Sequence, residues 1–198
     1  KTLAKKLHYT GYVAPAHAGP HPDLEGQNEI IVSAGGGSVG KAIFECAIDA
    51  ASLDTTQDWR ILVGGSNSDS EIKRLQKRAR SNNLVIESAR PDFRNMLHHA
   101  TCSVSMCGYN TALDLMQAGT PSVFIPFDEG GEVEQTLRAN SLAKHPGFSI
   151  LAANDLTPQS LIKSIHAVQT VEGARITNLE FDGANETVRI ATNWLNQV

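Results

Sequence analysis

The chain has 198 residues, of which 41% are hydrophobic and 19% charged, a composition typical of one folded domain with a sizeable core. Its 17 Lys and Arg against 21 Asp and Glu give a net charge of −4. No basic run alternates with aromatic residues, which argues against nucleic acid as a partner. The sequence has no apolar run long enough to span a bilayer and no signal-peptide pattern. These features predict a cytoplasmic protein and leave association with a membrane surface open.

The first part of the chain has the composition of a linker. Residues 14–29 contain Pro, Gly and His without an apolar period, which favours an irregular segment over a helix or strand. We therefore interpret residues 1–28 as the remnant of an interdomain linker and residues 29–198 as the folded domain.

From Ile30 onward, short apolar runs alternate with longer amphipathic ones. Strands are predicted at 29–34, 60–63, 84–86, 102–106, 122–125 and 148–151, and helices at 39–51, 69–80, 93–99, 111–118, 133–144 and 158–168. This alternation, with Val, Ile and Leu throughout the strands, predicts an α/β fold with a Rossmann-like parallel sheet of about six strands and helices on both faces. A last amphipathic run at 184–195 follows without a strand of its own.

The three cysteines are interpreted as reduced, buried thiols. Cys46, Cys102 and Cys107 are odd in number and fall on an apolar helix face or at a strand. Their spacing does not suit a metal site.

A glycine cluster, Ser33-Ala-Gly-Gly-Gly-Ser-Val-Gly40, joins the first strand to the first helix. Glycines there let the backbone approach a phosphate, to which the amides of the first helical turn donate. The cluster also fits the dinucleotide fingerprint, but NAD would need an acidic residue where the second strand ends in Val63-Gly64-Gly65-Ser66. The pattern therefore favours a phosphate site of another kind over NAD, and a glycine turn without ligand stays open.

The fourth unit, Ser105 to Asp114, meets several requirements of a nucleotide site within a short window. Gly108 permits close approach of a ligand, and Asn110 or Thr111 can cap the following helix. Asp114 lies at i+3 from Thr111 on the same helix face, where a carboxylate can accept from the hydroxyls of a ribose. A solvated Asp near a helix N-terminus is the alternative interpretation.

These motifs resemble the two donor-site motifs of MurG-like glycosyltransferases, which are family 28 enzymes with the GT-B fold. The matching segments are Gly36-Gly-Ser-Val-Gly40 and Ser105-x-x-Gly108-x-x-Thr111-x-x-Asp114-x4-Gly119-x-Pro121. The resemblance runs from about Gly11 to the C-terminus and covers only the donor-binding half of such enzymes. It implies an inverting, metal-independent transferase that moves a sugar, with N-acetylglucosamine as a candidate, from a UDP-sugar to an acceptor that the sequence does not identify.

The resemblance also implies roles for individual residues. It places Gly36, Gly37, Ser38, Gly108, Tyr109, Asn110 and Thr111 at the donor diphosphate, Ala89 and Arg90 at the uracil edge, Asp114 at the ribose, and Glu134 and Gln135 at the sugar hydroxyls.

The sequence departs from the family pattern at two positions. Asp114 stands where the family usually has Glu, so ribose contact would need a closer helix or a bridging water. Met106 stands where these enzymes often have Arg, which leaves the diphosphate to backbone amides, the helix dipole and Arg90. The loop 128–134 is acidic; it is interpreted as a solvated loop, or else as a selector of an amino-bearing sugar or a basic group on the acceptor.

The resemblance implies that the general base lies in an N-terminal acceptor domain absent from this chain, which alone is expected to be inactive. His98 and His99 are predicted to form a surface pair. The sequence has no Asp-x-Asp pair suited to a bridging magnesium ion, so neither a metal nor a cofactor is expected.

Two alternatives stay open. A nucleotide-sugar hydrolase or epimerase of the same fold would take its base from the acidic loop 128–134. A stand-alone donor-binding subunit would become active on docking a membrane-anchored partner, and an exposed apolar patch would favour it.

Overall fold

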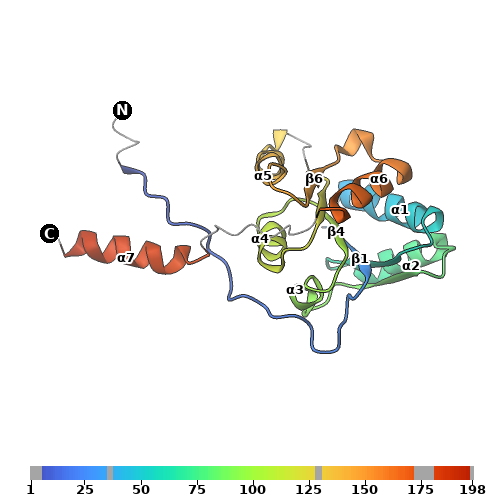
Figure 1. Ribbon diagram of the computed structural model, residues 1–198, viewed down its shortest axis with the longest axis horizontal. Helices are drawn as coiled ribbons and strands as arrows, with labels where there is room; N and C mark the ends of the chain where they lie inside the picture. Colours follow the sequence, from blue (N-terminus) through green and yellow to red (C-terminus); the bar gives the residue numbers. More distant parts are fainter. Residues whose placement is uncertain (1–5, 35–37, 128–130, 172–180, 197–198) are drawn as a thin grey trace. The chain divides into compact units, whose positions relative to one another are not determined.

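The computed structural model describes residues 6–34, 38–127, 131–171 and 181–196 (Figure 1). The chain divides into two compact units, which we call the larger unit, residues 18–175, and the smaller unit, residues 1–17 with 176–198. The larger unit begins at Ala18, ahead of the domain boundary predicted at residue 28. That boundary stays a prediction.

The larger unit contains a six-stranded parallel sheet with the order β3-β2-β1-β4-β5-β6. The strands are β1 (Glu29–Ala34), β2 (Asp58–Val63), β3 (Leu84–Ser88), β4 (Cys102–Ser105), β5 (Ser122–Phe124) and β6 (Phe148–Ile150). In β1, Ile30, Ile31 and Val32 are all 0% exposed, because a strand in the middle of a covered sheet is buried on both faces. The predicted Rossmann-like sheet is confirmed.

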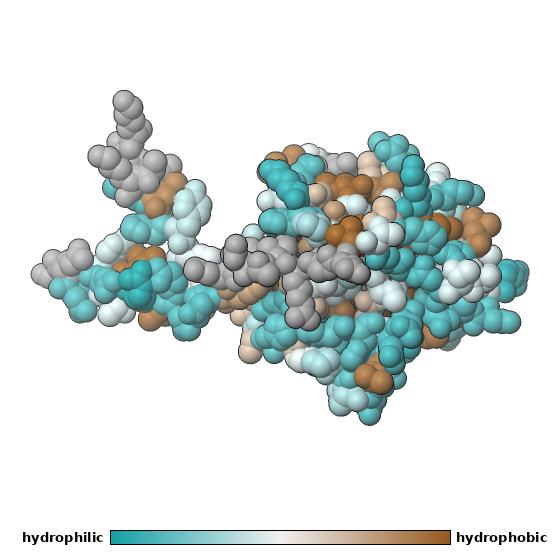
Figure 2. Space-filling model, in the orientation of Figure 1, coloured by the Kyte–Doolittle hydropathy of each residue, from teal (hydrophilic) through white to brown (hydrophobic). Residues whose placement is uncertain are grey.

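Helices cover both faces of the sheet (Figure 1). They are α1 (Ser38–Leu53), α2 (Ser68–Arg78), α3 (Phe93–Met96), α4 (Tyr109–Ala118), α5 (Glu134–Leu142) and α6 (Pro158–Gln169), with a short 3-10 turn, η3 (Ala153–Asp155). One core contains the apolar faces of α1 and α6, with Leu75 of α2, against side chains of the strands. Helices α3, α4 and α5 cover the other face. Figure 2 shows hydrophilic residues over most of the visible face, as expected when apolar side chains are used in two sheet-helix layers.

Helix α3 ends at Met96, earlier than the predicted residue 99. The ring nitrogens Nε2 of His98 and His99 hydrogen-bond the carbonyl oxygens of Ala18 and His21. Both histidines are half-buried. The prediction that they form a surface pair is therefore wrong, because they fasten residues 18–21 to the body of the larger unit.

The smaller unit contains helix α7 (Gly183–Leu195) and the extended residues 6–17. The Gly183 N–H donates to the Tyr12 carbonyl at 3.0 Å, and Val13 forms an antiparallel bridge with Asp182. Helix α7 confirms the helix predicted at 184–195. None of the helices in the described ranges has the length and apolarity that crossing a membrane requires.

Candidate functional site

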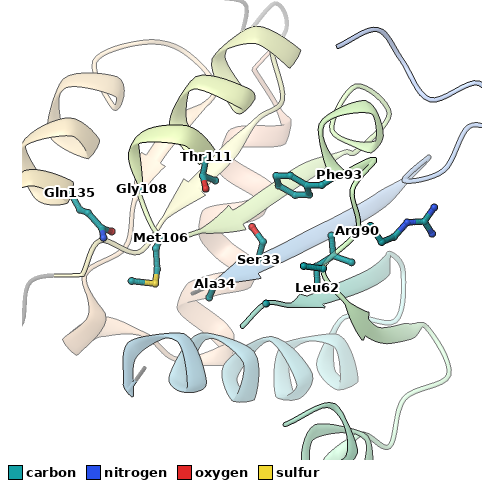
Figure 3. A pocket seen from close by; sticks show the side chains of 11 residues that line it. Ser33, Ala34, Leu62, Arg90, Phe93, Met106, Gly108, Thr111 and Gln135 are labelled. Atoms are coloured by element: carbon teal, nitrogen blue, oxygen red, sulfur yellow. The ribbon is translucent and has the colours of Figure 1, made fainter. Parts of the chain in front are cut away.

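A cavity of about 390 Å³ opens at the carboxyl edge of the sheet (Figure 3). It lies where β1 and β4 are neighbours, which is the point where the strand order reverses and where ligands bind in open α/β sheets. Its lining residues are Ser33, Ala34, Leu62, Gly64, Ala89, Arg90, Phe93, Met106, Gly108, Thr111 and Gln135. The cavity thus brings together four of the sequence-predicted regions: the end of β1, residues 89–90, the start of α4, and Gln135.

The N-terminus of α4 forms one wall of the cavity. Gly108 precedes the helix, and no side chain of the described residues caps the first turn. The first amides of a helix have no acceptor within the helix, and those of Asn110 and Thr111 belong to this first turn. The Thr111 hydroxyl points into the cavity in Figure 3 and has no hydrogen-bond partner among the described residues.

Gly108 is not required by the fold. Its φ of −63° and ψ of 152° are open to any residue. Among the described residues, a methyl group added at Gly108 would have Thr111 Oγ1, at 4.0 Å, as its nearest neighbour. With respect to that part of the chain, the glycine leaves open space in front of the helix N-terminus.

The sequence analysis missed two contributors to the site. The ring of Phe93, from α3, faces the cavity and gives it an aromatic wall (Figure 3). Arg138, from α5, donates from Nη1 to the Cys107 carbonyl at 2.7 Å and lies over the Tyr109 ring, 5.5 Å from the centroid. Its spacing from Glu134, with which it forms an ion pair, is one helical turn. The sequence shows that spacing, but it does not show that α5 packs beside the turn before α4.

Asp114 lies on α4 outside the cavity lining. Its Oδ1 accepts from Arg94 Nε at 2.8 Å, and Arg94 also donates from Nη2 to Gln117. Burial raises the pKa of the Asp114 carboxyl, and Arg94 opposes that rise. The proposed ribose ligand therefore already has a cationic partner.

Arg90 contributes to the cavity lining, but its guanidinium points away from it (Figure 3). Nε and Nη2 bind the two oxygens of Asp92 at 2.9 and 2.6 Å, and Nη1 donates to Glu25 at 3.2 Å. The Arg90 cation thus holds the segment around Glu25 to the body of the unit, so the expected neutralisation of a diphosphate by Arg90 has no support here.

Of the other residues predicted to bind the donor, some line the cavity and others do not. Gly36 and Gly37 lie outside the described residues, and Ser38 is the first residue of α1. Gln135 lines the cavity and its Oε1 accepts from the Phe127 N–H at 3.2 Å. The side chain of Glu134 is 68% exposed and faces Arg138. Met106, at the position where the resemblance implies Arg, lines the cavity with an apolar side chain.

A model of the glycosyltransferase family 28 C-terminal domain matches residues 30–183. The chain belongs to that family. The family 28 domain is 24% identical over 166 residues to a UDP-N-acetylglucosamine--N-acetylmuramyl-(pentapeptide) pyrophosphoryl-undecaprenol N-acetylglucosamine transferase of Bacillus thuringiensis, covering 82% of this chain and 45% of the relative. It spans less than half the length of such curated relatives, with 35% covered in that of Prochlorococcus marinus.

Solved structures share the fold of this family 28 domain. MurG of Acinetobacter baumannii superposes with a TM-score of 0.64 at 21% identity, covering 82% of this chain and 49% of MurG. A structure assigned as a UDP-N-acetylglucosamine 2-epimerase of Listeria monocytogenes superposes with a TM-score of 0.62 at 13% identity, covering 99% of this chain and 56% of the other. The family match and the curated relatives confirm the resemblance to MurG-like glycosyltransferases, whereas these two structural likenesses show the fold alone.

Proposed function

We propose that the family 28 domain binds the UDP-sugar donor of a glycosyltransferase, with the diphosphate at the N-terminus of α4. The observation that carries this proposal is the open space in front of Gly108, inside a cavity at the switch point of the sheet. Hydrogen bonds to charged groups contribute about 1.5 to 3 kcal/mol each. In this proposal the first-turn amides of Asn110 and Thr111, with the Thr111 hydroxyl, hold the diphosphate without a metal ion.

The other cavity walls fit the remaining parts of such a donor. Ala89 and the backbone of Arg90 lie across the cavity from α4, on the side where the base would lie, and Phe93 adds an aromatic surface there. Gln135 offers an amide to the hydroxyls of the sugar. We assign the ribose to Asp114, which would have to share its carboxylate between the ribose and Arg94.

The proposed reaction is transfer with inversion. An acceptor hydroxyl attacks the anomeric carbon while the bond from that carbon to the diphosphate oxygen breaks, and the helix N-terminus stabilises the leaving UDP. The hydroxyl proton passes to a general base, which we place in an N-terminal acceptor domain joined through residues 1–28. The sugar is proposed to be N-acetylglucosamine, because the curated relatives are named for its transfer. We further propose a cytoplasmic location with contact to a membrane surface, since those names specify an undecaprenol-linked acceptor.

The hydrolase or epimerase alternative shares this fold, as the likeness to the Listeria structure shows. The match to a glycosyltransferase family over residues 30–183 favours transfer. A stand-alone donor-binding subunit would use the same cavity and differ only in its partner.

Calorimetric titration with UDP, UDP-N-acetylglucosamine and NAD tests the proposal. The chain should bind both uridine nucleotides, with or without a chelator, and should not bind NAD. Gly108→Ala should weaken UDP binding at least about tenfold because the methyl group fills the space of the phosphate oxygens, while stability changes by less than about 1 kcal/mol. The matched control is Gly19→Ala, which also meets open space but lies outside the cavity. NAD binding, or equal UDP binding by both variants, would contradict the proposal.

A further inference from the structure

Three arginines lie around the candidate site, and their guanidinium groups have different partners. Arg90 binds Asp92 and Glu25, away from the cavity. Arg94 binds Asp114 and Gln117 on the flank of α4. Arg138, in contrast, reaches from α5 to the turn that starts α4, and its side chain is only 17% exposed.

Arg138 contacts the residues on either side of Gly108 in the sequence. On one side Nη1 donates to the carbonyl of Cys107, the residue before the glycine, at 2.7 Å. On the other side the guanidinium lies 5.5 Å from the centroid of the Tyr109 ring, the residue after it. One planar cation thus binds both flanks of the turn, and an arginine suits this double role because its donors form a rigid fork that also stacks on aromatic rings.

The positive charge of Arg138 acts electrostatically on Cys107, in the turn before α4. Burial raises the pKa of the Cys107 thiol to about 11, and the Arg138 charge acts in the opposite direction by favouring the thiolate. Glu134 offsets part of that charge, but its side chain is 68% exposed. An exposed carboxylate is largely screened by water, so the positive field on the turn persists.

We propose that Arg138 is the positioning residue of the diphosphate subsite: it fixes the Cys107-Gly108-Tyr109 turn and supplies the positive charge behind it. This inference rests on the proposed function. Arg138 acts through the turn, since it is not among the residues that line the cavity.

The test compares UDP with uridine, which lacks the diphosphate, in calorimetric titrations of the 198-residue chain. Arg138→Gln should weaken UDP binding about tenfold, equivalent to about 1.4 kcal/mol, and leave uridine binding unchanged. UDP binding to this variant should also weaken less steeply with added salt, because one charge has been removed. Arg138→Lys keeps the charge but loses the planar fork and the stacking on Tyr109, so it should weaken UDP binding less than Arg138→Gln does.

Arg74→Gln is the control, because Arg74 on α2 also forms ion pairs, with Glu45 and Glu71, and does not line the cavity. Far-UV circular dichroism checks that each variant is folded. Equal losses of UDP and uridine binding by Arg138→Gln would indicate a general structural role and overturn the inference, as would a Lys variant as weak as the Gln variant. If the unchanged chain binds no uridine nucleotide, the proposed function itself fails and this inference with it.

Discussion

Asp92 joins two parts of the larger unit through its carboxylate. Oδ1 accepts from Arg90 Nε at 2.9 Å, while Oδ2 accepts from Arg90 Nη2 at 2.6 Å and from His21 Nε2 at 3.1 Å. The hydrogen bonds from Arg90 hold the pKa of Asp92 well below its ordinary value. A carboxyl with a lowered pKa stabilises the fold at neutral pH and loses this contribution as pH falls below its unfolded-state pKa of about 3.9.

Asp92→Asn should therefore lower the free energy of unfolding by about 1 kcal/mol at pH 7, a figure reduced for the partial exposure of the pair. The difference between the two proteins should shrink as the pH falls below about 3.9 toward the lowered pKa of the folded state. Urea unfolding at several pH values measures this, with the exposed Asp23→Asn as control. A difference that stays constant down to pH 3 would rule out the ion pair as its source.

Individual site residues could be predicted only where local sequence fixes their position. Ala89 and Arg90 directly follow β3, and Gly108 and Thr111 lie at the start of the helix after β4; parallel strands bring their carboxyl ends to one edge, so these residues line one cavity. Their contacts with a donor stay predictions. The position of the Arg138 side chain and the direction of the Arg90 side chain depend on contacts between segments far apart in the sequence. Such contacts produce no local sequence pattern.

The elements were predictable where burial follows a regular pattern, as in the fully buried β4 and the half-buried α4. Strand β1 matches its predicted range, and α4 begins two residues before its predicted start. The exception is α3, after which the backbone continues in tighter turns: the N–H groups of His98 and His99 donate to the carbonyls of Asn95 and Met96, three residues back. The apolar pattern does not distinguish such turns from a continued α-helix.

Helix α6 begins with a reciprocal cap. Thr157 Oγ1 accepts from the Ser160 N–H at 3.1 Å, and Ser160 Oγ accepts from the Thr157 N–H at 2.9 Å, with Pro158 at the first helical position. Thr157→Ala should lower the free energy of unfolding by about 1 kcal/mol. UDP affinity should stay unchanged, because α6 does not line the cavity. Chemical denaturation with calorimetry on the same samples checks both; a loss of affinity would argue that α6 controls the site.

At the scale of the whole molecule, the two units can be probed separately at Gly183. A methyl group there would lie 2.8 Å from the Gly11 carbonyl oxygen and 3.0 Å from the Tyr12 carbonyl carbon. Both are backbone atoms, so they can move away only if the chain itself shifts. Gly183→Ala should therefore loosen α7, seen as faster amide hydrogen exchange in residues 183–195. Exchange in β1 and β4 and the affinity for UDP should stay as in the unchanged chain. Faster exchange throughout the sheet would contradict a local effect of this substitution.

The strand order has a consequence for how the chain is made. β1 leaves the ribosome first among the strands, yet it lies in the middle of the sheet, with β2 on one side and β4 on the other. Until β4 has been synthesised, one edge of the apolar β1 has no partner within the growing chain. Such an edge is a template for pairing with other chains. The arrangement that places the cavity at the centre of the sheet therefore delays the pairing of that edge within the chain until β4 has been made.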